Sequence, residues 1–69
     1  EITEILLVLE NDYNSYHRIR NALGDYENDI ITLAALRHTV RSQLIAHGFS
    51  ITLRNVIQVI TRFTVIRTE

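Results

Sequence analysis

The stretch DIITLAALRHTVRSQLIAH, residues 29–47, decides the fold, because it is predicted to form a helix around which the rest of the chain packs. An α-helix turns by about 100° per residue. At that angle one side of this segment is apolar, with Ile30, Leu33, Leu36, Val40 and Leu44. The other side is mixed rather than polar. A helix that is apolar on more than one side is usually covered by more than one neighbour, so we expect this one to be central.

Both ends of this helix carry capping signals. Asn28 or Asp29 can accept hydrogen bonds from the free N–H groups of a first turn. Gly48 suits the left-handed residue that follows a last turn, and Phe49 stands where such a cap places an apolar side chain against Leu44. The helix is therefore expected to begin at Asp29 and to end at His47.

The segment Glu1–Leu23 is predicted to form one long helix. Its seam residues alternate at spacings of four and three, as in a helix packed along one line, and only Arg20 interrupts the apolar pattern of Ile2, Leu6, Leu9, Tyr13, Tyr16 and Leu23. Asn11, Asn14 and Ser15 lower the helix propensity in the middle. Packing must hold that part straight, or the helix kinks there. Gly24 is expected to close it.

The short turn GDYEND, residues 24–29, predicts that these two helices fold back antiparallel to each other. With Leu23 beside Ile30, the register places Asp12 opposite Arg41. The remaining pairs are Tyr13 with Val40, Leu9 with Leu44, and Tyr16 with Arg37. The guanidinium of Arg37 is expected over the tyrosine ring or in a hydrogen bond with its hydroxyl.

Residues 50–69 allow either a helix or a strand. Ser50 or Thr52 can cap a helix, and one side of that helix is apolar, with Leu53, Val56, Ile57, Ile60, Phe63 and Thr64. The same segment is rich in Val, Ile, Thr and Phe, which favour strands. We predict the helix, with residues 64–69 as a short strand or a frayed end. The expected fold is an all-α domain over residues 1–69, an antiparallel helical hairpin plus a shorter third helix.

Length and composition predict a partner. The chain has 69 residues, 46% of them hydrophobic, and no cysteine for a disulfide. A domain of this size buries only about 60% of the surface of its unfolded chain, and small domains without staples often associate. We therefore expect a homo-oligomer or docking on another protein. No apolar run approaches a membrane span, which favours a cytoplasmic protein with no membrane partner. The absence of Met suggests processing or a piece of a longer protein.

No pattern of catalytic or metal-binding residues emerges. His17, His38 and His47 lack the spacing that places two ligands on one helix face. The serines Ser15, Ser42 and Ser50 do not lie in a strained, glycine-flanked turn. We predict that the protein is not an enzyme and has no cofactor and no metal.

Charge is divided unevenly along the chain. Residues 1–29 hold seven acids and two arginines, a net charge of −5, and residues 30–69 hold five arginines and one acid, a net charge of +4. This division indicates either a basic face for an anionic partner or pairing between the first helix and the others.

The segment QLIAHGFSITLRNVIQVITRFTVIRTE, residues 43–69, resembles the helix-turn-helix half of winged-helix regulators. In that family a helix ends in a glycine, here Gly48, an apolar residue follows, here Phe49, and a polar cap, here Thr52, opens the recognition helix. A basic strand comes after it. The resemblance implies that the major groove would be contacted by Arg54, Asn55, Gln58 and Arg62.

The chain departs from this family in three respects. The common Thr/Ser-Val-Ser-Arg segment is replaced by residues 55–58 (NVIQ), and a second wing strand is absent. The sequence pI of about 6.3 is low for a protein that contacts phosphates.

Two functions are consistent with the sequence. The first is a non-enzymatic protein-interaction or oligomerisation module that uses Ile31, Ala35, Ile45 and the apolar side of the last segment. The alternative is a helix-turn-helix DNA-binding regulator that uses the four polar residues of the resemblance.

Overall fold

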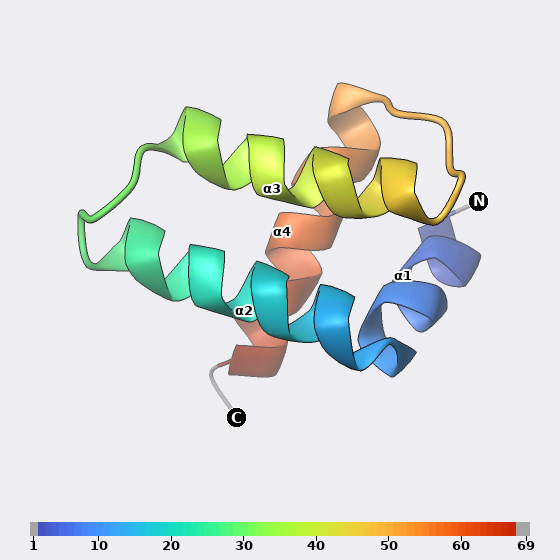
Figure 1. Cartoon of the computed structure of the whole chain (residues 1–69), viewed down its shortest axis with the longest axis horizontal. Coiled ribbons are helices and arrows are strands. Elements are labelled where there is room, and N and C mark those ends of the chain that lie inside the picture. Colours follow the sequence, from blue (N-terminus) through green and yellow to red (C-terminus); the bar gives the residue numbers. More distant parts are fainter. Residues whose placement is uncertain (1, 68–69) are drawn as a thin grey trace.

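The computed structural model describes residues 2–67 of the chain, and the side chains of residues 2–65. It contains the helices α1 (Ile2–Asn11), α2 (Tyr13–Glu27), α3 (Leu33–Ala46) and α4 (Leu53–Arg67). Helices α2 and α3 lie side by side and antiparallel, α4 crosses behind them, and α1 covers one end (Figure 1). The predicted all-α class is confirmed over the described residues, while the hairpin-plus-short-helix arrangement needs the corrections below.

The predicted helix Glu1–Leu23 is in fact two helices that meet at Asp12. The backbone of Asp12 is extended (φ −100°, ψ 110°), so the chain changes direction within the segment of low helix propensity. The turn also changes which residues face inward. Tyr13 is largely exposed instead of lying in the seam, whereas Ser15 is buried. Gly24 does not end the helix, because α2 continues to Glu27.

The expected N-cap of the central helix was wrong, because Asp29 belongs to the end of α2. The N–H of Asp29 donates to Tyr26 O at 3.1 Å and that of Ile30 to Asp25 O at 2.8 Å, the two bonds of a Schellman motif. Asp29 is the left-handed residue of this motif (φ 61°). Helix α3 begins only at Leu33, where Thr32 Oγ1 accepts from Ala35 N at 3.1 Å.

The predicted end of the central helix is confirmed. Gly48 is left-handed (φ 80°). Its N–H donates to Ile45 O at 2.9 Å, and the N–H of Phe49 donates to Leu44 O at 3.0 Å, which completes a second Schellman motif. His47 occupies the C-cap position.

The predicted hairpin register was also wrong. Asp12 contacts His47 rather than Arg41, because residues 28–32 form a longer turn than expected and Ile30 lies outside the helix, largely exposed. The cation over Tyr16 is Arg20, whose guanidinium carbon lies 5.3 Å from the ring centroid and whose Nη1 donates to the tyrosine hydroxyl, and not Arg37.

The last segment, for which the sequence allowed a helix or a strand, forms the helix α4 over Leu53–Arg67. Thr52 Oγ1 accepts from Asn55 N at 3.1 Å, which confirms one of the two predicted caps. The helix has 15 residues, as many as α2, so it is not a shorter element. The predicted strand is wrong for residues 64–67, which are helical, and residues 68–69 lie outside the described part.

The core is contributed by all four helices. Helix α4 packs against each of the other three, and this burial explains why a segment rich in β-branched residues is helical. The buried apolar residues are Ile5, Leu9, Ile19, Ala22, Leu23, Leu36, Val40, Leu44, Val56, Val59 and Phe63. Within residues 2–67, no helix combines the length and apolar character needed to cross a membrane.

Candidate functional site

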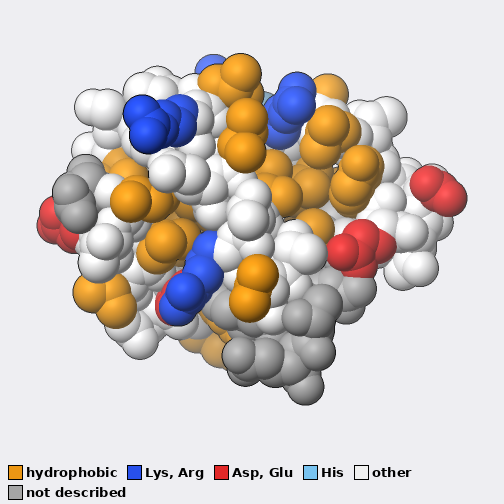
Figure 2. All heavy atoms as spheres, turned by 180° about the vertical axis from the view of Figure 1, so that it is seen from behind, with side chains coloured by type: hydrophobic (Ala, Val, Ile, Leu, Met, Phe, Trp, Pro, Cys, Tyr) orange, Lys and Arg blue, Asp and Glu red, His pale blue; other side chains and the backbone are white. Residues whose placement is uncertain are grey.

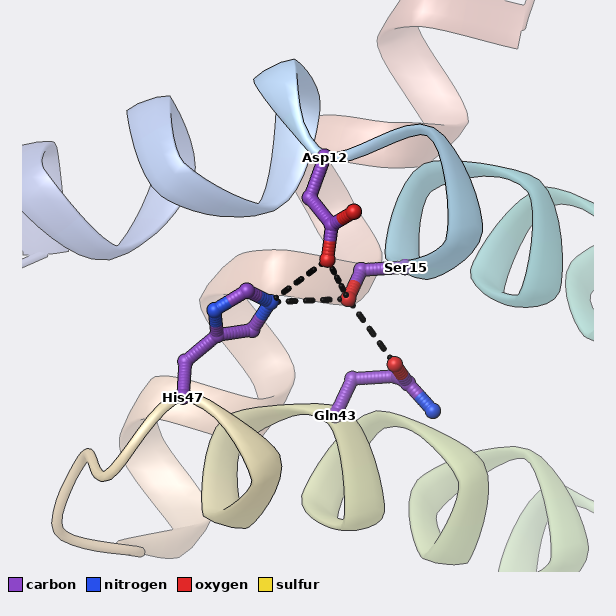
Figure 3. A network of polar contacts seen from close by, with 4 residues as sticks. All are labelled: Asp12, Ser15, Gln43 and His47. Carbon is purple, nitrogen blue, oxygen red and sulfur yellow. Dashed lines mark hydrogen bonds and ion pairs between the residues drawn. The ribbon is translucent and has the colours of Figure 1, made fainter.

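Four polar side chains meet where the junction of α1 and α2 lies against the end of α3 (Figure 3). Ser15 Oγ lies 3.0 Å from Asp12 Oδ2, 2.8 Å from Gln43 Oε1 and 2.9 Å from His47 Nε2. His47 Nε2 also lies 3.0 Å from Asp12 Oδ2. Ser15 is only 1% exposed. We call these four residues the polar cluster.

The polar cluster contains the residue types of a Ser-His-Asp triad but not its geometry. In a triad, the carboxylate holds one ring nitrogen of the histidine while the serine contacts the other. Here Asp12 and Ser15 both contact Nε2 of His47. The buried hydroxyl of Ser15 is also inaccessible to a substrate. This arrangement favours a structural role, in which the cluster ties the α1–α2 junction to α3.

The electrostatics of the cluster centre on Asp12. The hydrogen bond from Ser15 is the largest cause that holds the pKa of the Asp12 carboxyl below its ordinary value. Burial opposes it, while a hydrogen bond from the backbone N–H of Asn14 and the neighbouring His47 lower the pKa further. The Ser15 hydroxyl has a single proton, so it donates to Asp12 or to Gln43 but not to both at once. The ionised carboxylate is the stronger acceptor.

The sequence gives no signal for this cluster, because Ser15 and His47 are 32 residues apart and neither belongs to a motif. The other two histidines do not join it. His17 stacks on Tyr13 and contacts Asn21, and His38 is exposed. Among the described residues, no group of three or more His, Cys, Asp or Glu side chains could hold a metal ion.

A second feature is an apolar groove between α1 and α4. It has a volume of about 430 Å³ and is lined by Ile2, Leu6, Ile57, Gln58, Thr61, Arg62 and Val65. A smaller hollow of about 180 Å³ adjoins it, lined by Thr3, Leu6, Leu7, Glu10 and Arg62. We call both together the α1/α4 groove. Figure 2 shows hydrophobic side chains gathered over several parts of this face of the molecule, with basic side chains between them.

An ion pair divides the two parts of the groove. Arg62 Nε donates to Glu10 Oε2 at 2.9 Å, and both residues line the groove. The pair joins the end of α1 to α4 and partly neutralises the arginine. The half-exposed apolar residues Leu7, Ile57 and Val65 lie along the same groove.

The residues proposed from the sequence are distributed unevenly around this groove. Gln58 and Arg62 line it, Arg54 is exposed and Asn55 is partly buried.

The three proposed partner-facing residues lie elsewhere. Ile31 packs against the core, Ala35 is partly buried, and only Ile45 is largely exposed. The α1 side of the groove was missed, because α1 and α2 had been read as one helix.

Comparison with known proteins assigns the chain to no family. No protein-family model, no curated protein and no solved structure matches it.

Proposed function

We propose that this chain is a non-enzymatic interaction module that self-associates through the α1/α4 groove. The observation that carries the proposal is the set of half-exposed apolar side chains along that groove, Leu7, Ile57 and Val65. Removing apolar surface from water contributes about 25 cal/mol per Å². A grouped apolar surface of this kind is typical of an interaction site rather than of a solvated face.

Charge supports a second copy as the occupant. Helix α1 carries Glu4 and Glu10 and no basic residue, whereas α4 carries Arg54, Arg62 and Arg67 and no acidic residue. Glu10 and Arg62 pair within one copy, so the charges left for a second copy include Glu4 and Arg54. In a twofold dimer the same surface is used by both copies. If α1 of one copy lies on α4 of the other, the acidic helix meets the basic helix twice, and this complementarity favours the pairing over other orientations.

Replacing Ile57 with glutamate is expected to weaken self-association at least about tenfold, because a carboxylate would have to be desolvated in the groove. Glutamate is a good helix former, and Ile57 is already 45% exposed, so the fold should persist. The matched control is Ile45→Glu on α3, where the side chain is 58% exposed and lies outside the groove. Sedimentation equilibrium over a range of concentrations measures both.

Two outcomes would overturn this proposal. A wild-type chain that is monomeric at the highest attainable concentration excludes self-association. Dissociation caused by Ile45→Glu but not by Ile57→Glu would move the interface to α3, where the sequence first suggested it.

The helix-turn-helix alternative is favoured by one observation, the exposed Arg54 in the first turn of a helix capped by Thr52. Against it, Arg62 is engaged by Glu10, whose carboxylate would repel a phosphate nearby. Fluorescence anisotropy with a labelled duplex separates the two functions. DNA binding requires an affinity that falls steeply with salt and falls again in Arg54→Ala, whereas the interaction module predicts no binding of the duplex.

A further inference from the structure

A pocket distinct from the α1/α4 groove lies between α3 and the beginning of α4. It has a volume of about 330 Å³ and is lined by Arg37, Arg41, Ile51, Leu53 and Val56. The two arginines come from α3, Ile51 from the preceding linker, and the other two from the first turns of α4. We call it the α3/α4 pocket. It therefore combines an apolar wall with a cationic one.

The two arginines of the cationic wall form no ion pair with the described residues. Arg37 and Arg41 are four positions apart on one helix, so their side chains are neighbours and their like charges repel. Neither guanidinium has a hydrogen bond or ion pair with the described residues, and Nε of Arg37 is buried without a partner. A buried donor without an acceptor is unusual in a folded protein.

The chemistry that would satisfy this wall is an anion. A carboxylate accepts from Nε–H and one Nη–H of a guanidinium at once, and Arg37 could make this pair after its guanidinium turns toward the pocket. Arg41, the second arginine, would contact the same carboxylate. The apolar side chains Ile51, Leu53 and Val56 suit a ligand whose body is hydrocarbon. The volume lies near the lower end of ligand pockets, about 300–1,000 Å³, which favours a small ligand.

We propose that the α3/α4 pocket binds an apolar carboxylate, with Arg37 and Arg41 on the carboxylate and the apolar wall against its body. Such a group occurs in a free apolar acid and in an apolar C-terminal residue of a peptide. This proposal is independent of self-association, because the pocket shares no lining residue with the α1/α4 groove.

The test is an NMR titration of the ¹⁵N-labelled chain with four probes. Octanoate represents the free acid and N-acetyl-leucine the C-terminal residue, while octanol and N-acetyl-leucinamide are their uncharged counterparts. We expect saturable shifts centred on the amides of Ile51, Leu53 and Val56 with at least one acid, and binding of its uncharged counterpart about tenfold weaker or more. The acid that binds more tightly identifies the source of the carboxylate.

Two variants compare the loss of an arginine inside the pocket with the loss of an arginine outside it. Arg41→Gln removes one guanidinium at an exposed position and is expected to weaken binding of the acid about tenfold. Arg18→Gln makes the same change at an exposed position of α2 and should leave binding unchanged. The proposal is overturned if neither acid binds, if the uncharged probes bind equally well, or if the two variants behave alike.

The same samples keep this proposal apart from the proposed function. Arg41→Gln should leave the solution mass unchanged, and Ile57→Glu should leave binding of the acid unchanged. The solution mass therefore tests self-association, and the NMR titration tests binding in the α3/α4 pocket, so that either proposal can fail while the other holds.

Discussion

Replacing Phe63 with alanine is expected to remove most of the stability of the fold. The side chain is fully buried, with 0% of its surface exposed, and it is the largest of the fully buried residues. Truncation of a buried phenylalanine costs about 3–5 kcal/mol, from lost burial and the cavity left behind. A chain of this length has a free energy of unfolding of about 3–10 kcal/mol. Urea unfolding followed by far-UV circular dichroism should therefore show a greatly lowered midpoint or no folded baseline.

The position of Phe63 explains why the effect should spread through the molecule. It lies on α4, which packs against the three other helices, and its ring lies 5.5 Å from that of Tyr16 on α2, tilted by 47°. Leu53→Ala is the control, since Leu53 is on the same helix but is 61% exposed. If both variants unfolded at the same urea concentration, α4 would not be an integral part of the core.

The core-facing residues of α3 and α4 could largely be predicted from the sequence, because periodicity within one helix is a local property. On the predicted apolar stripe of the central helix, Leu36, Val40 and Leu44 are fully buried, whereas Ile30 and Leu33 at its beginning are exposed. For α4, strand propensity competed with the helical pattern, and burial against three helices decided between them. Val56 and Phe63 are buried as predicted, whereas Val59 is buried without having been predicted, and Leu53 and Ile57 are more exposed than predicted.

The relation between helices could not be predicted, because it depends on turns whose signals are weak. The seam spacing continues through Asp12 as if no break were there, so one helix was expected instead of α1 and α2. At the next turn the left-handed residue is Asp29 rather than a glycine. Asp29 was therefore assigned to the start of the following helix. Each of these wrong helix boundaries shifts the predicted residue pairs between the helices, including the partner predicted for Asp12.

For the same reason, only the α4 side of the α1/α4 groove could be predicted from the sequence. Gln58 and Arg62 are predicted as residues facing DNA, and Ile57 belongs to the apolar side of the last segment that is predicted to face a partner. Their neighbours in the groove come from α1, which lies beside α4 only because the chain turns at Asp12. The polar cluster ties this turn to α3, so we expect the position of α1 beside α4 to depend on it.

Replacing Ser15 with alanine is expected to lower the free energy of unfolding by about 1.5–3 kcal/mol, the range for a hydrogen bond to a charged group. The hydroxyl is buried and lies within 3.0 Å of Asp12, Gln43 and His47. Its loss leaves these groups without their common partner. Ser42→Ala on α3 is the matched control, since Ser42 makes no side-chain hydrogen bond within the described residues and should change stability by less than about 0.5 kcal/mol. Equal effects of the two substitutions would contradict a structural role for the cluster.

The same cluster predicts a loss of stability in acid. The pKa of Asp12 is lower in the folded chain than in the unfolded one. The ionised carboxylate therefore makes its full contribution to the free energy of unfolding above the ordinary carboxyl pKa of about 4, and this contribution is lost as the pH falls through the pKa of the folded chain. The neutral variant Asp12→Asn cannot titrate, so its stability should fall less steeply than that of the wild type over this window. Urea unfolding at a series of pH values measures the difference, and parallel curves would contradict the prediction.

If α1 is held in place by this junction, acid should also weaken self-association through the α1/α4 groove in the wild type. Asp12→Asn should reduce that dependence, because the substitution changes only the junction and leaves the ion pair between Glu10 and Arg62 in place. Comparing the two chains therefore isolates the junction from the ion pair. A dissociation constant that changes with pH identically in both would place the sensitivity outside the junction and would separate the polar cluster from assembly.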